Sequence, residues 1–299
     1  MTHALIIGRR RKGRPIAELA ADTANALQQA GWRVDARLVA RKRELTRKAR
    51  KAVKAGCDVV VVVGGDGAVL RVAPALAKTT ASLGIVPAGT GNLLATNLGI
   101  PRDVPAAVRT ILNGSKRTID LGRAVVGGKA YDFSIACGIG FDADVMDGTD
   151  SSQKRRWGKL AYLASAVART GEIENVEHEI TADGMRTVTD AAQVLVANFG
   201  RMALGIRPRR SILPDDGMLD VIVVRASGPI GGLLAGWEAL RQRDLGESPQ
   251  GHVLRARARE ICVEAKPPRR VEVDGSVVGK TPVAISILPS ALTVIVPES

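Results

Sequence analysis

The sequence predicts an α/β fold in the first part of this 299-residue chain and an all-β fold in the second. Up to residue 116, apolar strand-like runs alternate with helix-periodic segments, the pattern of a parallel sheet with helices on both faces. From 117 to 290, strand-like runs recur between turn residues, which predicts an antiparallel β-sandwich. We therefore expect domains at 1–116 and 117–290, followed by a tail at 291–299.

Each element of the first domain has its own pattern. Val59 to Val63 is an uninterrupted run of β-branched residues, typical of a strand buried on both faces. Gly31 and Gly56 follow helix-periodic segments, and we expect each to end a helix. In order, we expect a strand at 3–7, a helix at 16–30, a strand at 33–39, a basic helix at 45–53, strands at 59–63 and 82–86 that are each followed by a helix, from about 69 and from 93, and a last helix at 104–112.

Strands dominate the second part of the chain. Turn pairs such as Gly127-Gly128 and Asp274-Gly275 separate the apolar runs, as in antiparallel sheets. We expect strands at 119–126, 129–137, 177–182, 191–198, 219–224, 258–264 and 271–273, with helices at about 157–167 and 230–240.

Two glycine-rich turns follow neighbouring strands of the first domain. Gly64, Gly65, Asp66 and Gly67 come directly after the strand at 59–63, and Gly89, Thr90, Gly91 and Asn92 follow the strand at 82–86. Glycines let backbone N–H groups approach a ligand closely, and a helix that begins in such a turn favours a phosphate. A single turn of this kind is also ordinary turn chemistry. Two of them at the carboxyl ends of parallel strands predict one ligand-binding crevice.

Composition narrows the classes of partner. The formal net charge is +13, with basic clusters at 9–14, 41–54, 154–156, 207–210 and 269–270. Such a charge favours phosphorylated ligands, an anionic membrane surface or nucleic acid, although it also suits a merely solvated surface. Nucleic acid is the less favoured partner, because aromatic residues for base stacking make up only 3%.

Targeting and redox features are sparse. No apolar run reaches the roughly 18 to 20 residues of a transmembrane helix, and no secretory signal is recognised at the N-terminus. Three scattered cysteines, Cys57, Cys137 and Cys262, indicate neither a disulfide framework nor a zinc site. We therefore expect a cytoplasmic protein, peripherally associated with the membrane. The sequence leaves open whether the protein forms a homodimer.

The paired turns carry a family resemblance. With Leu94-Ala95 and Leu98-Gly99 behind them, they resemble the diacylglycerol kinase-like lipid kinases of bacterial type, which include diacylglycerol, sphingosine and ceramide kinases. NAD kinases and phosphofructokinases share only the first turn. The likeness extends, in the right order, through segments at 120–122, 133–142, 156–162, 198, 205, 215–220 and 273–275.

The resemblance implies an ATP- and Mg²⁺-dependent lipid kinase. ATP would lie between the domains, held by the residues of both turns, and a lipid hydroxyl would accept the phosphoryl group. Asp66 would be the Mg²⁺ ligand or a carboxylate at the chemistry, and Asp274 would help to close the active site. Asp216, with carbonyls near Leu213 and Met218, would hold a structural metal. The tail at 291–299 would return to the first domain. Asp66 and Asp216 are also ordinary turn-forming residues.

The chain departs from the family pattern at several positions. Ser276 stands where the family has its usual proposed base, a glutamate, and Ala68 stands where it has a threonine. No Asn-Pro loop follows the first strand, although Arg9, Arg10 and Arg11 there can bind phosphate. The leading hypothesis is a kinase of diacylglycerol or a related lipid alcohol. The alternatives are a catalytically weak nucleotide- or lipid-binding protein, a kinase of a soluble substrate such as NAD, and a nucleic-acid-binding protein.

Overall fold

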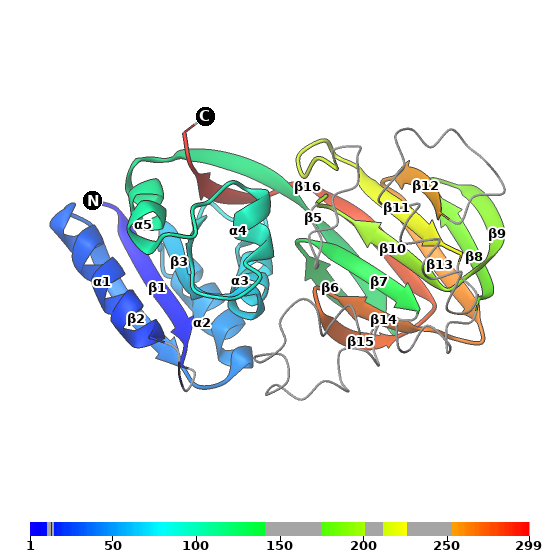
Figure 1. Cartoon of the computed structure of the whole chain (residues 1–299), viewed down its shortest axis with the longest axis horizontal. Coiled ribbons are helices and arrows are strands. Elements are labelled where there is room, and N and C mark those ends of the chain that lie inside the picture. Colours follow the sequence, from blue (N-terminus) through cyan, green and yellow to red (C-terminus); the bar gives the residue numbers. More distant parts are fainter. Residues whose placement is uncertain (11–12, 14, 141–174, 201–211, 226–252, 299) are drawn as a thin grey trace. The chain divides into compact units, whose positions relative to one another are not determined.

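The structure is a computed structural model that describes residues 1–10, 13, 15–140, 175–200, 212–225 and 253–298. The chain forms two compact units (Figure 1). Unit 1 comprises Met1–Leu121 and Pro289–Ser299, and unit 2 comprises Gly122–Leu288. The C-terminal segment therefore belongs to the same unit as the N-terminus.

Unit 1 alternates strands and helices along the chain, as the apolar pattern predicts. Its elements are β1 (His3–Arg9), α1 (Ile16–Gln29), β2 (Arg33–Val39), α2 (Lys42–Lys54), β3 (Val59–Gly64), α3 (Asp66–Val72), a 3₁₀ turn (Ala73–Leu76), β4 (Ser82–Pro87), α4 (Leu93–Asn97), α5 (Val104–Asn113) and the first part of β5 (Ser115–Val126). The last part of β16 (Val283–Val296) completes the unit.

The sheet of unit 1 is parallel, in the order β2-β1-β3-β4-β16. Alternate residues of β1 and β3, such as Ile6 and Val61, pack with helices α1 and α5 in one core cluster. The residues between them, such as Ile7 and Val62, point to the other face and are also fully buried. Because both faces are covered, β3 is apolar along its whole length.

Unit 2 is a sandwich of antiparallel strands. Its remaining strands are β6 (Lys129–Phe133), β7 (Ala136–Gly140), β8 (Val176–Ala182), β9 (Met185–Ala191), β10 (Gln193–Ala197), β11 (Leu219–Val224), β12 (Val253–Ala258), β13 (Glu260–Lys266), β14 (Arg270–Val273) and β15 (Ser276–Lys280). One sheet contains β16-β13-β8-β9, and the other has the order β12-β11-β10-β7-β14-β15. Residues of both sheets, for example Val263 and Val196, share one apolar core. The predicted fold class is confirmed.

Strand β16 belongs to both units. Its first part pairs antiparallel with β13, from Val283 to Ser286, and its last part pairs parallel with β4, through Thr293 and Val294. Ala291 also accepts a backbone hydrogen bond from Lys78 at 2.7 Å. Within the tail expected at 291–299, residues 291–296 are thus the end of a long strand that lies in the sheet of unit 1.

Some boundaries differ from the sequence expectation. Helix α3 begins at Asp66 rather than near Val69, because the turn passes directly into the helix at Gly65. The run expected at 258–264 is the end of β12 and most of β13. Strand β9 was not expected, because its first four residues are all exposed and include both apolar and polar side chains. The expected helices at 157–167 and 230–240, and the basic clusters at 154–156 and 207–210, lie outside the described residues, as does Arg11.

Candidate functional site

The first glycine-rich turn joins β3 to α3 without a linker. Gly64 is the last residue of β3 and is paired with Pro87 of the neighbouring strand β4. Gly65 is extended and precedes the first helical residue, Asp66. The backbone N–H groups at the start of α3 therefore face the carboxyl-terminal edge of the sheet, where open α/β sheets bind ligands.

The second turn is folded around the Asn92 side chain. Asn92 Oδ1 accepts a hydrogen bond from Gly89 N at 2.9 Å, and its Nδ2 donates to Gly89 O at 3.0 Å. Its backbone is left-handed, with φ 52°, a conformation in which Asn is several-fold enriched among non-glycine residues. A single buried amide thus fixes the loop that precedes α4.

The two turns touch, and glycine is what lets them do so. A Cβ atom on Gly65 would lie 2.7 Å from Gly89 Cα, and one on Gly89 would lie 2.4 Å from Gly65 Cα. Asp66 Oδ1 bridges the turns by accepting a hydrogen bond from Leu93 N. Helices α3 and α4, which follow the turns, pack against each other (Figure 1). The sequence prediction that the turns form one site is consistent with this arrangement.

A cavity of about 340 Å³ opens beside the turns. Backbone of both turns forms much of its wall, and side chains from β1, α1 and α2 complete it. Its lining residues are Arg9, Ile16, Lys42, Gly64, Gly65, Asp66, Gly67, Ala68, Ala88, Gly89, Thr90 and Gly91. From the residues that the structure describes, the cavity has backbone donors, two cationic side chains and one carboxylate, a combination suited to a phosphorylated ligand.

Asp66 is the carboxylate of this cavity. Burial raises its pKa above the ordinary value of 3.8, while hydrogen bonds from the backbone of Leu93 and Asn92, and the charge of Arg102, act in the opposite direction. Arg102 is itself tied to the second turn, because its guanidinium donates to Gly91 O at 2.8 Å. A carboxyl group with a raised pKa in a cavity is a candidate functional residue.

Comparison with protein families gives two consecutive matches. A model of the "Diacylglycerol kinase catalytic domain" matches residues 3–124, and a model of the "YegS C-terminal NAD kinase beta sandwich-like domain" matches residues 135–296. A "Probable lipid kinase YegS-like" protein of Pseudomonas putida is 31% identical over 271 residues, which cover 89% of this chain and 86% of that protein. The chain belongs to the diacylglycerol kinase-like lipid kinase family.

Further matches include two relatives and one solved structure. A "Probable lipid kinase YegS-like" protein of Pseudomonas aeruginosa is 32% identical over 281 residues, covering 91% of this chain and 87% of the relative. An uncharacterized protein of Synechocystis sp. is 29% identical over 245 residues, covering 81% of this chain but 55% of that protein. A solved structure of a "putative diacylglycerol kinase" from Bacillus anthracis matches with a TM-score of 0.80 at 24% identity, covering 99% of this chain and 96% of the other, which shows the shared fold.

Asp274, the second carboxylate predicted for this lipid kinase-like site, lies in unit 2. Its two carboxylate oxygens accept hydrogen bonds from three successive backbone N–H groups, those of Ser134, Ile135 and Ala136, at 2.8 to 3.2 Å. Asp274 itself adopts a left-handed conformation, with φ 45°, in the turn between β14 and β15. The side chain therefore fastens this turn to the connection between β6 and β7.

Asp216, the predicted ligand of a structural metal, pairs with a cationic side chain. Its Oδ2 accepts a hydrogen bond from the Arg257 guanidinium, and its Oδ1 accepts one from Met218 N at 3.1 Å. Arg257 Nε also lies 3.8 Å from Asp220 Oδ2. No group of three or more His, Cys, Asp or Glu residues arranged for a metal occurs among the described residues. The metal at Asp216, with backbone carbonyls as its other ligands, stays a prediction, and no chemistry is assigned to it.

Two residues of the site have weak sequence signals. Lys42 was one of many cations in a basic segment, and only the cavity distinguishes it from its neighbours. Arg102 lies in the loop before α5 and gave no signal at all. Arg9 was anticipated through the arginine run after the first strand, and it does line the cavity.

Proposed function

We propose that this chain is an ATP- and Mg²⁺-dependent lipid kinase that transfers the γ-phosphoryl group to a hydroxyl of diacylglycerol or a related membrane lipid. One observation carries the proposal. Two touching glycine-rich turns line a cavity beside Asp66, in a chain with relatives named as probable lipid kinases. The residues assigned to the nucleotide are Gly64, Gly65, Asp66, Gly67, Gly89, Thr90, Gly91 and Asn92.

The reaction demands positioning and charge neutralisation more than covalent chemistry. The lipid hydroxyl oxygen forms a bond to the γ-phosphorus, the bond from that phosphorus to the β–γ bridging oxygen breaks, ADP leaves, and the hydroxyl proton passes to a base. The backbone N–H groups of the two turns orient the phosphates. Asp66 Oδ1 is held by Leu93 N, which fixes the carboxylate at the cavity wall.

The donor set at Asp66 fits Mg²⁺, which is usually bound in proteins by one or two carboxylates together with substrate phosphates. When bound, the ion would neutralise charge that develops on the phosphates. In the alternative role, without the ion on its carboxylate, Asp66 accepts the hydroxyl proton, and burial raises its pKa in the direction that suits a base. Asp274 has both oxygens engaged by backbone N–H groups, so we assign it a positioning role.

Phosphoryl transfer from γ-labelled ATP tests this function. The full chain is incubated with Mg²⁺ and mixed micelles that contain diacylglycerol, a sphingoid base or total bacterial lipid, and an Asp66→Asn variant is the control. We expect a labelled lipid with at least one acceptor, and a loss of about 10²- to 10⁴-fold in the variant. No labelled lipid from any acceptor would contradict the proposal.

Ser276 supports a second candidate. It stands at the start of β15, where the family resemblance leads us to expect a glutamate, so the chain can be a nucleotide- or lipid-binding protein with little catalysis. The same assay separates the two: ATP binding by calorimetry without any labelled lipid would favour the binding protein. Light scattering during gel filtration tests the homodimer.

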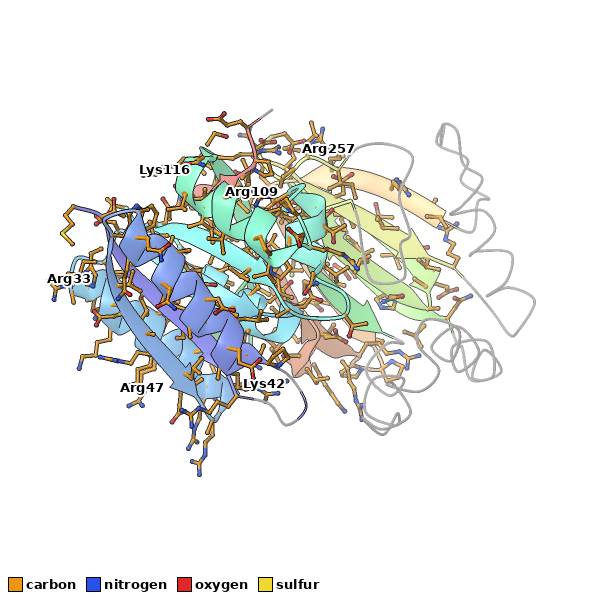
Figure 2. All side chains as sticks on the ribbon, turned by 60° about the vertical axis from the view of Figure 1, so that its left-hand side comes forward. Arg33, Lys42, Arg47, Arg109, Lys116 and Arg257 are labelled. Atoms are coloured by element: carbon orange, nitrogen blue, oxygen red, sulfur yellow. The ribbon has the colours of Figure 1, made fainter. Side chains whose placement is uncertain are left out.

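We further propose that helix α2 holds the protein reversibly on an anionic membrane. Within the described residues, no helix is both long and apolar enough to cross a bilayer. The buried face of α2 carries Leu45 and Ala49. Its exposed positions are occupied by Lys42, Arg43, Arg47, Arg50, Lys51 and Lys54. Figure 2 shows Arg47 extending away from the ribbon. Each such cation near an anionic leaflet is worth about 1 kcal/mol.

Vesicle sedimentation tests the membrane contact. Replacing Arg47, Arg50 and Lys51 with Gln removes three charges and is expected to weaken binding to phosphatidylglycerol vesicles about 100-fold, since three contributions of about 1 kcal/mol are lost. Replacing the exposed cations Lys129, Arg259 and Lys280 of unit 2 with Gln makes the same change in net charge and is the control. Equal effects of the two triple variants would exclude a specific role for α2.

A further inference from the structure

Arg9 and Lys42 are the two cationic residues that line the cavity, among the residues the structure describes. We propose that they form a phosphate-binding pair, which grips the polyphosphate of a nucleoside triphosphate from the β1–β2 side of the cavity. This inference rests on the proposed nucleotide-dependent function and adds to it the residues that set affinity for the phosphate chain.

The topology of the sheet brings the two residues together. β1 lies between β2 and β3, with Arg9 paired to Val39 at the end of β2. Arg10 N continues the ladder to Val39 O at 3.0 Å, and α2 begins three residues after Val39, at Lys42. Both cations therefore leave the carboxyl-terminal edge of the sheet, the edge from which Gly64 and Gly65 also emerge.

Close packing fixes the backbone that presents Arg9. A Cβ atom on Gly8 would lie 2.8 Å from Val63 O and 2.9 Å from Ile16 Cγ2, so the end of β1 fits tightly between β3 and the start of α1. Ile16 is itself a cavity-lining residue. The side chain of Arg9 thus begins from a rigid position next to the first glycine-rich turn.

Positive charge gathers at the start of α2, beside the cavity. Arg102 is the cation that lowers the pKa of Asp66. Lys42 also lies between Arg41 and Arg43 in the first turn of α2, where the positive end of the helix dipole disfavours cations and Glu44 is the sole acidic residue. An anionic ligand in the cavity would balance this concentration of positive charge.

The two side chains suit different parts of a polyphosphate. The guanidinium of Arg9 presents a planar fork that can bond two phosphate oxygens at once, whereas the ammonium of Lys42 (Figure 2) acts as a point charge. Together with the backbone N–H groups of the two turns, they provide donors on two sides of the cavity. The ligand class is a nucleoside triphosphate, and its polyphosphate is the part that is recognised.

Calorimetric titration of the full-length protein tests the pair with three probes: ATP, inorganic tripolyphosphate and adenosine. Arg9→Gln and Lys42→Gln are each expected to weaken ATP and tripolyphosphate about 10- to 100-fold, the effect of losing a hydrogen bond to a charged group, and to leave adenosine unchanged. Arg9→Lys keeps the charge but loses the fork, and it is expected to fall between the wild type and Arg9→Gln. Arg43→Gln, an equal charge change one residue along α2 and outside the cavity lining, is the matched control.

The possible results test the phosphate-binding role of Arg9 and Lys42 independently of the lipid kinase activity. Phosphate affinity that is unchanged in both Gln variants, or reduced as much by Arg43→Gln, would overturn the inference even if the lipid is phosphorylated. If the Gln variants selectively lose ATP and tripolyphosphate binding in a protein that labels no lipid, the phosphate-binding role of the pair is supported and the lipid kinase activity is excluded. Thermal unfolding of every variant shows whether it is folded, and Arg9→Lys gives the answer for Arg9 if Arg9→Gln does not fold.

Discussion

The contact between Gly65 and Gly89 is the tightest feature of the candidate site at the scale of single residues. A Cβ atom on Gly89 would approach both Gly65 Cα and Asn92 Oδ1, at 2.4 and 2.7 Å, whereas a Cβ atom on Gly67 would meet nothing within 4 Å. We predict that Gly89→Ala lowers the free energy of unfolding by about 1–3 kcal/mol, as in overpacked cores. Gly67→Ala, in helix α3, is expected to raise it by up to about 1 kcal/mol. Urea titration measures both, and equal effects would contradict the contact.

The carboxyl of Asp66 gives the reaction a pH dependence with a definite sign. Burial raises its pKa, so on acidification activity is expected to fall at a pH above the ordinary value of 3.8. The charge of Arg102 lowers the same pKa, so Arg102→Met raises it further and moves the acid limb of kcat/KM to higher pH. A pH–rate profile of the two proteins measures this shift. An acid limb that moves to lower pH, or does not move, would show that Asp66 does not control the rate.

Residues of the site differ in how far the sequence could predict them. Gly64 to Gly67 and Gly89 to Asn92 follow neighbouring apolar strands, and this position at the carboxyl ends of parallel strands predicted one crevice. The family resemblance added the nucleotide as its ligand. Arg102 and Lys42 are ordinary surface cations until the fold is known, because their proximity to the turns depends on how separate elements pack. Asp274 was expected as an active-site residue, and only its three backbone partners reveal what it holds.

At the scale of elements, Asp274 joins two turns of unit 2. Its oxygens satisfy three successive backbone N–H groups, at Ser134, Ile135 and Ala136. Asp274→Ala leaves these donors without the carboxylate, and we predict a loss of about 2–4 kcal/mol in the free energy of unfolding. Denaturant unfolding followed by far-UV circular dichroism measures it. As a control, Glu177→Ala removes an exposed ion pair with Lys266 and should cost about 1 kcal/mol or less. Equal losses of stability in the two variants would argue against a special role for the three hydrogen bonds to Asp274.

Strand β3 has a complete hydrophobic pattern and was predicted with nearly correct bounds, whereas strand β9 has no such pattern and was not predicted. Strand β3 is apolar throughout because helices cover both faces of its sheet, so its pattern is unambiguous. Strand β9 lies at the edge of its sheet and exposes Met185 and Val188, so its residues alternate too weakly to indicate a strand. The strand forms because it pairs with β8, and this pairing is a tertiary contact that the local sequence of β9 does not indicate.

At the scale of the whole molecule, β16 links the two units through one continuous strand. Within unit 1, its last part pairs with β4 and buries Leu292, Val294 and Ile295. The sequence showed a run of apolar residues near the C-terminus but gave no indication of its partner strand, and the family resemblance supplied that expectation. Without this part of β16, the edge of β4 and the apolar side chains beside it would be exposed to water.

Ending the chain at Leu288 therefore tests how far the nucleotide site depends on the C-terminus. We predict that this truncation abolishes measurable ATP binding and lowers the midpoint of thermal unfolding by more than 10 °C, because several fully buried side chains and a strand partner of β4 are lost at about 2–5 kcal/mol for each large side chain. Ending the chain at Val296 removes only residues beyond β16 and is the control. Calorimetry and scanning fluorimetry measure both proteins. If the chain that ends at Leu288 bound ATP and unfolded like the control, β16 would be dispensable for unit 1, and the nucleotide site would be complete within the first 121 residues.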